Sequence, residues 1–526
     1  MNNAAPPNAR RLLLVGFFAI FAAGVGFSVR GGVLVQWAAA YDFTQAELGG
    51  ITGGGLWAMG IVFILGSMIA DKVGYGRLMV VAVLMHLLSA GLQLFMDEIY
   101  VGFGRGEEGR RAVQFALTLA MVFFAVGNGI CEVVVNPMVA TLYPNNKTHY
   151  LNILHAGWPG GLITGGIISY FMKMYGVHWM VQMSMFLIPV AIYAFLMLGQ
   201  HMPRSEASEA GVPFTTMLKE FLAPLLLLLL VIHAMVGFVE LGSDSWMQDI
   251  LNRVMHGLGE GYGTLLFIYT SALMFGLRFF GGPIEHRLSP LGLLFMSSVI
   301  ACAGLILFCY APRESVIIFV VAATVYGIGK TFFWPTMLAV VSERFPRGGA
   351  LTLGTIGGIG MLSAGLLGAP SIGFEQDYYA VQKLSEPGTK DVYLRYASEK
   401  PKASPLDLFE VKGLDVPKTN LLALDREIQA EKKDAKKKEG LEEEFHRRLK
   451  HTPELKVWWD ASKSYAATDA EPINEAEMYG GQMALGLTAV VPATMAVLYL
   501  LLILYFRTQG GYKRLAVESA APHNKP

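Results

Sequence analysis

The chain has 526 residues, with 41 basic and 41 acidic side chains, so its formal net charge is zero. Hydrophobic residues make up 53% of the sequence and charged residues only 16%. This composition excludes a water-soluble globular protein, which could not cover its surface with polar groups, and the lack of a basic cluster argues against nucleic-acid binding. The cysteines Cys131, Cys302 and Cys309 stand in apolar segments without metal-ligand spacing, so we expect no disulfide, metal site or cofactor.

Long apolar segments recur along the chain. A helix needs about 20 apolar residues to cross the core of a bilayer, and it satisfies its own backbone hydrogen bonds there. By this measure the sequence predicts an all-α membrane protein with twelve transmembrane helices. They are expected at residues 12–37, 48–70, 78–97, 112–141, 150–172, 178–200, 221–249, 262–283, 290–311, 315–342, 350–373 and 478–506.

Two polar segments divide this series. The predicted divisions are an N-terminal six-helix bundle at 1–201, a cytoplasmic linker at 202–220, helices seven to eleven at 221–374, a charged insert at 375–476, and helix twelve with a cytoplasmic tail at 477–526. The insert is expected to be a solvated, partly helical loop. Within it Leu421, Leu424 and Ile428 follow helical spacing, and we expect Gly440 to end that helix.

Basic side chains gather in alternate loops, for example at Arg11, Lys72 and Arg344, whereas the loops between them are mixed or acidic, as at Glu107. The positive-inside rule therefore predicts that both termini are cytoplasmic. The insert is then external, and as a long loop it is exempt from the rule. We expect a monomeric, multi-pass protein of a bacterial inner membrane, in contact with lipid.

The two halves of the chain echo each other. The fourth predicted span contains GICEVVVNP at 129–137, and the tenth contains GIGKTFFWP at 327–335. Secondary transporters build two bundles from repeated halves, which rock about a binding site near the middle of the membrane. Glycines crowd spans two, five and eleven, where they let helices approach closely, and polar groups fall on spans one, four, seven and ten. We therefore predict two pseudo-symmetric six-helix bundles around a polar cavity.

A polar stripe marks the fourth span. Asn128, Glu132 and Asn136 recur at four-residue steps and share one face of a helix. A charge at the centre of a bilayer costs about 2.5–3.5 kcal/mol on insertion scales, so such groups usually serve a function. We interpret Glu132 as a proton carrier at a substrate site; the alternative is a structural ion pair that locks two helices.

Other charges stand at comparable depth. Lys330 occupies the position in the tenth span that corresponds to Glu132, and we expect the two to attract each other across the cavity. Glu240 and Asp244 lie four residues apart on the seventh span, and Arg30 on the first span is expected to pair with them. Asp244 is near the outer end and could simply be solvated. For Lys330 the alternative is a purely structural counter-charge.

Tryptophans stand near these groups. Trp334 lies one turn beyond Lys330, and Trp158 and Trp246 also neighbour polar residues. Flat rings beside carboxylate and amide groups suit a sugar, whose CH face stacks on the ring while its hydroxyls form hydrogen bonds. For Trp158 and Trp246 the alternative is the tryptophan belt at the membrane surface, for which Trp334 is too deep.

The loop after the second span reads GSMIADKVGYGR at 66–77 and resembles the signature loop of the major facilitator superfamily, with Ser67 in place of its leading glycine. In that family the acid of the loop caps and charge-locks neighbouring cytoplasmic helix ends while the bundles rock. The resemblance implies the major facilitator fold. It also implies gating roles for Asp71, Lys72, Gly74 and Arg77.

The segment 129–137, followed by Leu142-Tyr143-Pro144, is similar to the fucose, galactose and glucose proton symporters of that superfamily. In those permeases a fourth-helix glutamate followed by Asn-Pro carries the coupling proton and contacts the sugar; Glu132 and Asn136 match these positions. They also use a first-helix aspartate, near which this chain has Arg30-Gly31. The resemblance thus leaves two possibilities, a different set of proton-carrying groups or Glu240 in place of the missing carboxylate.

Together these observations predict a transporter and not an enzyme: proton-coupled uptake of a monosaccharide or related polyol by alternating access. Two alternatives stay open. The first is transport of another small solute, such as a nucleoside, organic acid or drug, inward or outward. The second is a membrane sensor that does not transport and whose external insert recognises a partner.

Overall fold

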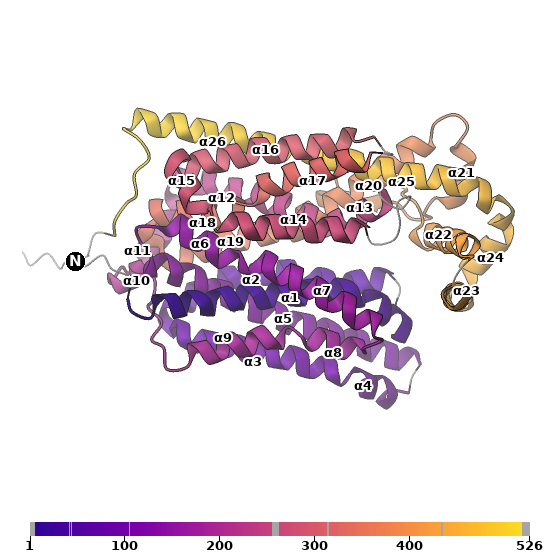
Figure 1. Ribbon diagram of the computed structural model, residues 1–526, viewed down its shortest axis with the longest axis horizontal. Helices are drawn as coiled ribbons and strands as arrows, with labels where there is room; N and C mark the ends of the chain where they lie inside the picture. The colour runs from indigo at the N-terminus through magenta and orange to yellow at the C-terminus, as the bar shows by residue number, and fades with distance from the viewer. Residues whose placement is uncertain are drawn as a thin grey trace, which may run out of the picture.

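The computed structural model describes residues 6–41, 43, 45–104, 106–254, 262–312, 315–432 and 435–517. Most of these residues are helical, and the helices form two bundles that run along the long axis of the molecule (Figure 1). One bundle contains the first half of the chain and the other the second half. The helix that opens the chain begins, and the last helix ends, at one end of the bundles, named here the terminal end, and the insert lies at the opposite, insert end (Figure 1).

The first bundle and the linker contain α1 (Ala9–Tyr41), α2 (Gln45–Val73), α3 (Tyr75–Leu94), α4 (Met96–Gly102), α5 (Glu107–Leu142), α6 (Lys147–His155), α7 (Gly157–Met174), α8 (Trp179–Ser184), α9 (Leu187–Met197), α10 (Glu206–Glu209), α11 (Phe214–Lys219) and the 3₁₀ turn η1 (Glu220–Leu222). The second bundle contains α12 (Pro224–Gly237), the π-helical turn η2 (Phe238–Gly242), α13 (Ser243–Val254), α14 (Tyr262–Arg278), α15 (Gly281–Leu288), α16 (Pro290–Tyr310), α17 (Val316–Lys330), α18 (Phe333–Arg344), the 3₁₀ turn η4 (Pro346–Gly348), α19 (Gly349–Ser363), the π-helical turn η5 (Ala364–Gly368), α20 (Ala369–Leu384), α25 (Ala466–Thr488) and α26 (Val490–Thr508).

Helix occupies each of the twelve predicted spans. Among the described residues, ten helices are long and apolar enough to cross a membrane, or eleven when the bent pair α14 and α15 counts as one span. The fifth predicted span is divided into α6 and α7, which meet at Ala156. The prediction of an all-α, multi-pass membrane protein is therefore confirmed.

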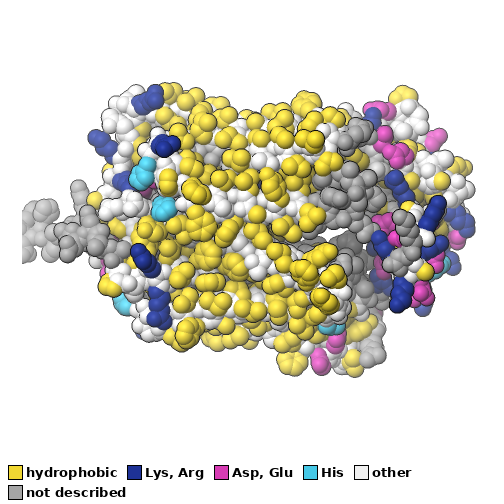
Figure 2. Space-filling model, in the orientation of Figure 1, with side chains coloured by type: hydrophobic (Ala, Val, Ile, Leu, Met, Phe, Trp, Pro, Cys, Tyr) yellow, Lys and Arg dark blue, Asp and Glu magenta, His cyan; other side chains and the backbone are white. Residues whose placement is uncertain are grey.

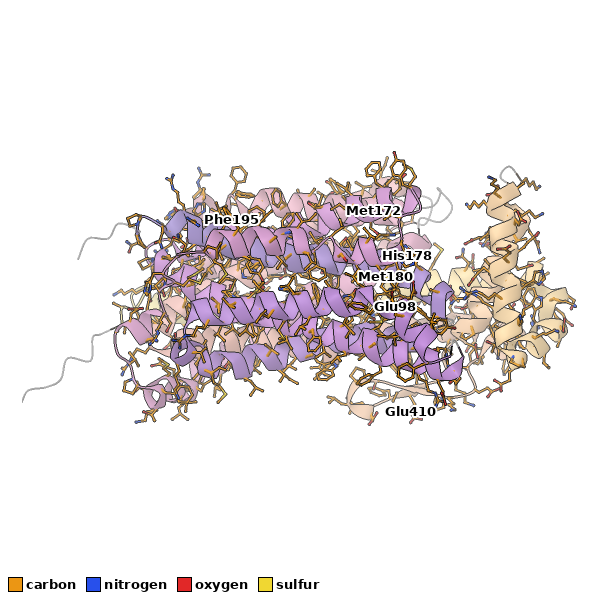
Figure 3. All side chains as sticks on the ribbon, turned by 90° about the horizontal axis from the view of Figure 1, so that it is seen from below. Glu98, Met172, His178, Met180, Phe195 and Glu410 are labelled. Atoms are coloured by element: carbon orange, nitrogen blue, oxygen red, sulfur yellow. The ribbon has the colours of Figure 1, made fainter. Side chains whose placement is uncertain are left out.

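The outer surface of the bundles is apolar over most of its length (Figure 2). Large hydrophobic side chains are exposed on α3, α9, α16 and α26, and Phe195 of α9 points outward in Figure 3. Lysines and arginines lie at the terminal end, and charges of both signs lie at the insert end (Figure 2). An apolar surface of this size is one that lipid covers, which agrees with the predicted contact of the protein with lipid.

Glycines determine how closely the helices approach. Helix α2 of the first bundle packs along α19 of the second, and a Cβ on Gly358 would lie 2.8 Å from the carbonyl oxygen of Gly60. Between α1 and α7, a Cβ on Gly161 would lie 2.3 Å from the carbonyl oxygen of Phe21. Because neither contact admits a larger side chain, the glycine-rich spans form close helix contacts, as predicted.

The insert folds around an apolar core, which corrects the expectation of a solvated loop. It contains α21 (Lys390–Tyr396), β1 (Lys402–Ala403), the 3₁₀ turn η6 (Pro405–Asp407), β2 (Glu410–Val411), α22 (Val416–Ala430), α23 (Ala435–His451), α24 (Pro453–Ser462) and the 3₁₀ turn η7 (Lys463–Tyr465). The antiparallel strands β1 and β2 form a small hairpin. Tyr396, Leu421 and Trp459 are buried in one cluster, and fully buried Asp469 accepts two hydrogen bonds from Arg395, at 2.5 and 2.7 Å.

The boundaries of the insert also differ from the prediction. Helix α20 continues to Leu384 and α25 begins at Ala466. These two flanking helices therefore extend past the bundles and carry the insert (Figure 3). The predicted helix through Leu421 is α22, but it ends at Ala430, and Gly440 lies inside α23. The prediction that Gly440 ends this helix is therefore wrong. Residues 518–526 of the predicted tail lie outside the described residues.

Candidate functional site

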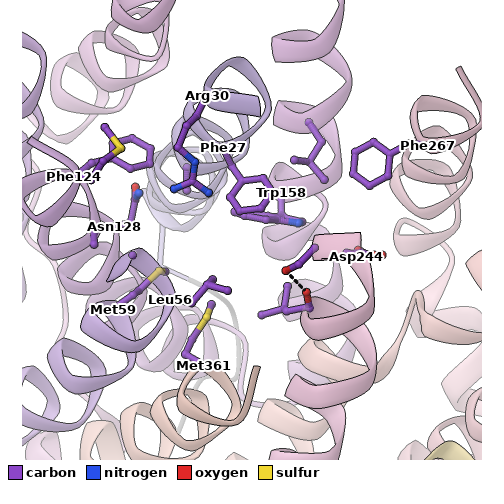
Figure 4. A pocket seen from close by; sticks show the side chains of 17 residues that line it. Phe27, Arg30, Leu56, Met59, Phe124, Asn128, Trp158, Asp244, Phe267 and Met361 are labelled. Atoms are coloured by element: carbon purple, nitrogen blue, oxygen red, sulfur yellow. Dashed lines mark hydrogen bonds between the residues drawn. The ribbon is translucent and has the colours of Figure 1, made fainter. Parts of the chain in front are cut away.

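A cavity of about 710 Å³, part of it open to solvent, lies between the two bundles (Figure 4). Its walls come from α1, α2, α5 and α7 of the first bundle and from η2, α13, α14 and α19 of the second. Of the predicted site residues, Arg30, Asn128 and Asp244 line it. The surface between the bundles is hollowed at the insert end (Figure 2).

Asp244 and Lys330 form an ion pair on the wall that belongs to the second bundle. Lys330, the last residue of α17, is buried, and its ammonium nitrogen lies 5.2 Å from the centre of the Tyr326 ring. The prediction that Lys330 faces Glu132 across the cavity is therefore wrong, because its partner is a carboxylate of its own bundle. Asp244 is not simply solvated, since its side chain is only 12% exposed.

Glu132 lies on the terminal side of the cavity, in a cluster of polar side chains. The amide of Asn136 donates to the Glu132 carboxylate at 2.7 Å, and the amide oxygen of Asn136 lies 2.9 Å from His155 Nε2. His155 Nε2 is also 3.9 Å from the Glu132 carboxylate. One turn nearer the insert end, Asn128 Oδ1 lies 2.9 Å from His86 Nε2. The predicted stripe therefore begins at the cavity wall and continues into buried protein.

Arg278, which the sequence analysis did not identify, connects this cluster to the second bundle. It is 1% exposed. Its guanidinium donates to the carbonyl oxygen of His155 at 2.5 Å, to that of Thr331 at 3.0 Å and to the Glu240 carboxylate at 3.1 Å. His155 belongs to the first bundle, whereas Thr331 and Glu240 belong to the second. A charge inside the predicted span 262–283 was a signal of the same kind as the one that identified Glu132.

Glu240 lies in the π-helical turn η2, and π-helical turns inside α-helices are frequent at functional sites. Arg278 binds Glu240 Oε1, and the buried Glu240 Oε2 has no hydrogen-bond partner among the described residues. The prediction that Arg30 pairs with Glu240 or Asp244 is wrong. The Arg30 guanidinium instead lies 4.7 Å from the centre of the Phe27 ring.

Trp334 does not line the cavity. It is buried in the second bundle, where its ring centre lies 4.6 Å from that of His233. Trp158 does line the cavity, with its ring centre 5.4 Å from that of Phe27. The aromatic group available to a solute is therefore Trp158, not Trp334. Trp246 is bound to the second bundle through a hydrogen bond to the carbonyl oxygen of Ala369, at 2.7 Å.

The predicted gating loop lies at the terminal end. Asp71, near the end of α2, accepts hydrogen bonds from Ser205 Oγ at 2.6 Å and from Tyr75 at 3.0 Å. Ser205 caps α10, so Asp71 holds the linker between the bundles. Gly74 joins α2 to α3 with a φ of 92°, which favours glycine. The Lys72 ammonium lies 5.0 Å from the ring centre of Phe214 in the linker, and Arg77 is exposed.

Hydrogen bonds to backbone carbonyl oxygens join the two bundles at the terminal end. Buried Lys147 of α6 donates to Glu206 of the linker at 2.8 Å and to the carbonyl oxygen of Ser342 on α18 at 3.2 Å. Helix α6 also packs against α15 and α18. In the C-terminal segment, Arg514 contacts Glu285 at 3.0 Å and the carbonyl oxygen of Asn145. These contacts close the molecule on this side of the cavity.

The arrangement couples two buried carboxylates to the contact between bundles. Glu132 belongs to the first bundle and Glu240 to the second, and Arg278 lies between their clusters. Protonation of a carboxylate removes its attraction for a neighbouring cation and so weakens the contact that the cation makes. Among the described residues, no group of three or more His, Cys, Asp or Glu side chains is arranged to hold a metal ion.

Comparison with known proteins places this geometry in a family. The model of the Major Facilitator Superfamily matches residues 16–369. No curated protein sequence matches the chain.

Solved structures share the fold at low sequence identity. The E. coli fucose:proton symporter FucP in its outward conformation has a TM-score of 0.54 and 18% identity, over 70% of this chain and 92% of that one. The proton:xylose symporter XylE, bound to 6-bromo-6-deoxy-D-glucose, has a TM-score of 0.54 and 14% identity, over 68% and 86%. A bacterial homologue of the human lysosomal transporter Spinster, inward-facing and unoccupied, has a TM-score of 0.57 and 14% identity, over 94% and 98%.

Proposed function

Because the chain belongs to the Major Facilitator Superfamily, a family of transporters, we propose that it is a secondary active transporter that moves a small organic solute together with protons. One observation carries the proposal: Arg278 joins the two bundles by binding the buried Glu240 carboxylate and the carbonyl oxygen of His155, whose ring lies 3.9 Å from the buried Glu132 carboxylate. A scaffold without transport has little reason to keep such charges in the membrane.

In the proposed cycle the structure corresponds to the state in which the cavity is reached from the insert end. A proton and the solute enter from that side, and protonation of Glu132 weakens its attraction for Arg278. The bundles then separate at the terminal end and close at the insert end, and the solute and proton leave on the other side. The glycine contact between α2 and α19 is the surface about which the bundles rock.

The proposed setting is a bacterial inner membrane, with the terminal end in the cytoplasm. Arg11, Lys72 and Arg344 would then lie on the cytoplasmic side, as the positive-inside rule predicts. The transporter would then act as a monomeric importer. A monosaccharide or polyol is the first solute to test, because FucP and XylE share the fold and are sugar symporters. Trp158 in the cavity supports stacking with such a solute.

Glu132→Gln is expected to abolish proton-driven accumulation. With one proton per solute, a gradient of about one pH unit supports roughly tenfold accumulation, since one pH unit corresponds to about 1.4 kcal/mol. Proteoliposomes with labelled fucose, xylose and glucose measure this ratio. In the variant we expect a ratio near one, while exchange of solute across the membrane without a gradient persists.

The matched control for this experiment is Glu108→Gln, because Glu108 is an exposed glutamate at the start of the same helix. The control protein should accumulate solute like the unmodified protein. Undiminished accumulation by the Glu132→Gln protein would contradict the coupling role.

Removal of the insert distinguishes transport from sensing. Helices α20 and α25 pack against each other, so a short glycine-serine linker can replace residues 386–464. We expect solute exchange to be unchanged, because none of the residues of this segment that the structure describes lines the cavity. Size-exclusion chromatography must show a monodisperse protein. Loss of exchange in such a protein would favour an insert that takes part in function, as a sensor requires.

A further inference from the structure

The charges that line the cavity do not balance. Two lining side chains carry a full charge, Arg30 and Asp244. Asp244 is neutralised by Lys330. Arg30 has no ion pair or hydrogen bond with any residue that the structure describes. Its guanidinium instead forms a cation–π contact with Phe27, 4.7 Å from the centre of the ring. The cavity wall therefore carries one uncompensated positive charge.

An uncompensated cation inside the membrane-spanning region is costly, so we expect an anionic group to bind it. Of the basic side chains, arginine is the one that suits an anion of the solute, because its planar guanidinium binds a carboxylate through two parallel hydrogen bonds. Figure 4 shows Arg30 together with Phe27 and Trp158 on one part of the wall, with Asp244 elsewhere. An anion at Arg30 would thus avoid the carboxylate of Asp244.

The rest of the lining is poor in groups that could bind a neutral sugar. Apart from the indole of Trp158, two uncharged polar side chains of the described residues line the cavity, and both already have partners: Asn128 binds His86 at 2.9 Å, and Ser245 donates to the carbonyl oxygen of Leu241 at 2.9 Å. Most of the remaining wall is apolar or aromatic. A site for a polyhydroxylated solute needs several hydrogen-bonding groups, whereas this wall suits one anionic group on a flat or apolar body.

We propose that the transported solute is a small organic anion, whose carboxylate binds Arg30 and whose body packs on Phe27 and Trp158. The inference rests on the proposed transport function and names the class of its solute. An aromatic acid meets the description in full, whereas a hexuronate shares only the carboxylate and a face that stacks on a flat ring. The test therefore uses one probe of each kind.

Binding to the purified protein is measured with two pairs of probes, phenylacetate against phenylacetamide and glucuronate against glucose. Within each pair the body is nearly the same and only the acid carries a charge. Tryptophan fluorescence reports on binding, because Trp158 lines the cavity. We expect the acid of at least one pair to bind roughly tenfold or more tightly than its neutral partner, in line with a charge-assisted bidentate contact.

Two variants and a control test whether Arg30 itself makes the contact with the acid. Arg30→Gln should remove the preference for the acid, and Arg30→Lys should keep part of it, because lysine retains the charge but not the fork of donors. Arg111→Gln removes a charge that is 75% exposed on α5 and should leave the preference unchanged. In addition, phenylglyoxal should modify Arg30 and spare buried Arg278, and the bound acid should protect Arg30.

The proposal is overturned if neutral probes bind as tightly as their acids, if no probe of either pair binds, or if Arg30→Gln keeps the preference. In the last case Arg30 would serve as a counter-charge for another conformation. The proton-coupling proposal fails separately: it depends on accumulation across a pH gradient through Glu132, which a neutral solute could also undergo, whereas the binding assay requires no gradient.

Discussion

Replacing Arg278 with methionine is expected to lower the free energy of unfolding by about 3–5 kcal/mol and to abolish transport. Removing one partner of a buried ion pair leaves the other charge uncompensated, here Glu240, and costs about this much. The carbonyl oxygens of His155 and Thr331 lose a donor at the same time. Thermal denaturation in detergent measures the first effect, and solute exchange in proteoliposomes measures the second.

A second substitution separates the two effects. In the double variant Arg278→Met, Glu240→Gln the carboxylate that lost its ion-pair partner is also removed, so part of the lost stability should return. Transport should not return, because the link from the first bundle to the carboxylate of the second is still missing. Arg287→Gln, an exposed arginine on the neighbouring helix α15, is the control and should change neither quantity. A double variant less stable than Arg278→Met would refute the role of the uncompensated carboxylate.

The positions of the helices followed from the sequence because apolar length is a direct consequence of bilayer thickness. The positions at which helices break inside the spans did not follow from the sequence. The division at Ala156 and the π-helical turn that contains Glu240 depend on how neighbouring helices pack, and neither leaves a mark in the hydropathy of the segment. The π-helical turn nevertheless belongs to the site, since it carries a carboxylate that binds Arg278.

The charged residues of the site were largely found, but their partners were not. Lys330 and Glu132 occupy equivalent places in the two halves, which suggested that they meet. Whether two side chains meet depends on the rotation of each helix about its axis, and the repeat does not specify that rotation. In the structure Lys330 turns to Asp244 within its own bundle, and Arg278 takes the position between the bundles.

The insert shows a different limit of sequence reasoning. Its many charges suggested a solvated loop, but they lie on the surface of a small folded unit. The residues of its core, such as Tyr396, Leu421 and Trp459, are far apart in the sequence and belong to short helices. Periodicity identified α22 and did not reveal that the other helices of the insert pack on it.

The C-terminal segment crosses from one bundle to the other. Arg514 lies 3.0 Å from Glu285 on α15 and 2.9 Å from Glu343 on α18, and it also donates to the carbonyl oxygen of Asn145 in the first bundle. Tyr512 donates to Glu343 at 2.8 Å. Burial, together with the nearby Glu343 carboxylate, raises the pKa of the Tyr512 hydroxyl well above its usual range, so it stays protonated and keeps donating.

Arg514→Gln should therefore favour the conformation that is open at the terminal end. Both carboxylates are almost fully buried, whereas Arg514 is 37% exposed, so we expect a modest shift of roughly tenfold in the conformational equilibrium, about 1.4 kcal/mol. The reporter is a cysteine at Ala140, which is 4% exposed beside the contact between the bundles, in a protein without its three native cysteines. Its labelling by a water-soluble maleimide should accelerate in the variant.

Lys513→Gln provides the matched control, since it removes the same charge from the neighbouring position, whose side chain is exposed and has no ion pair among the described residues. Labelling at Ala140→Cys should then keep its original rate. If both substitutions accelerate labelling equally, the effect is one of general charge and not of the contact that Arg514 makes. If neither does, the C-terminal segment does not hold the bundles together, and Lys147 with its partners Glu206 and Ser342 must suffice to close this end.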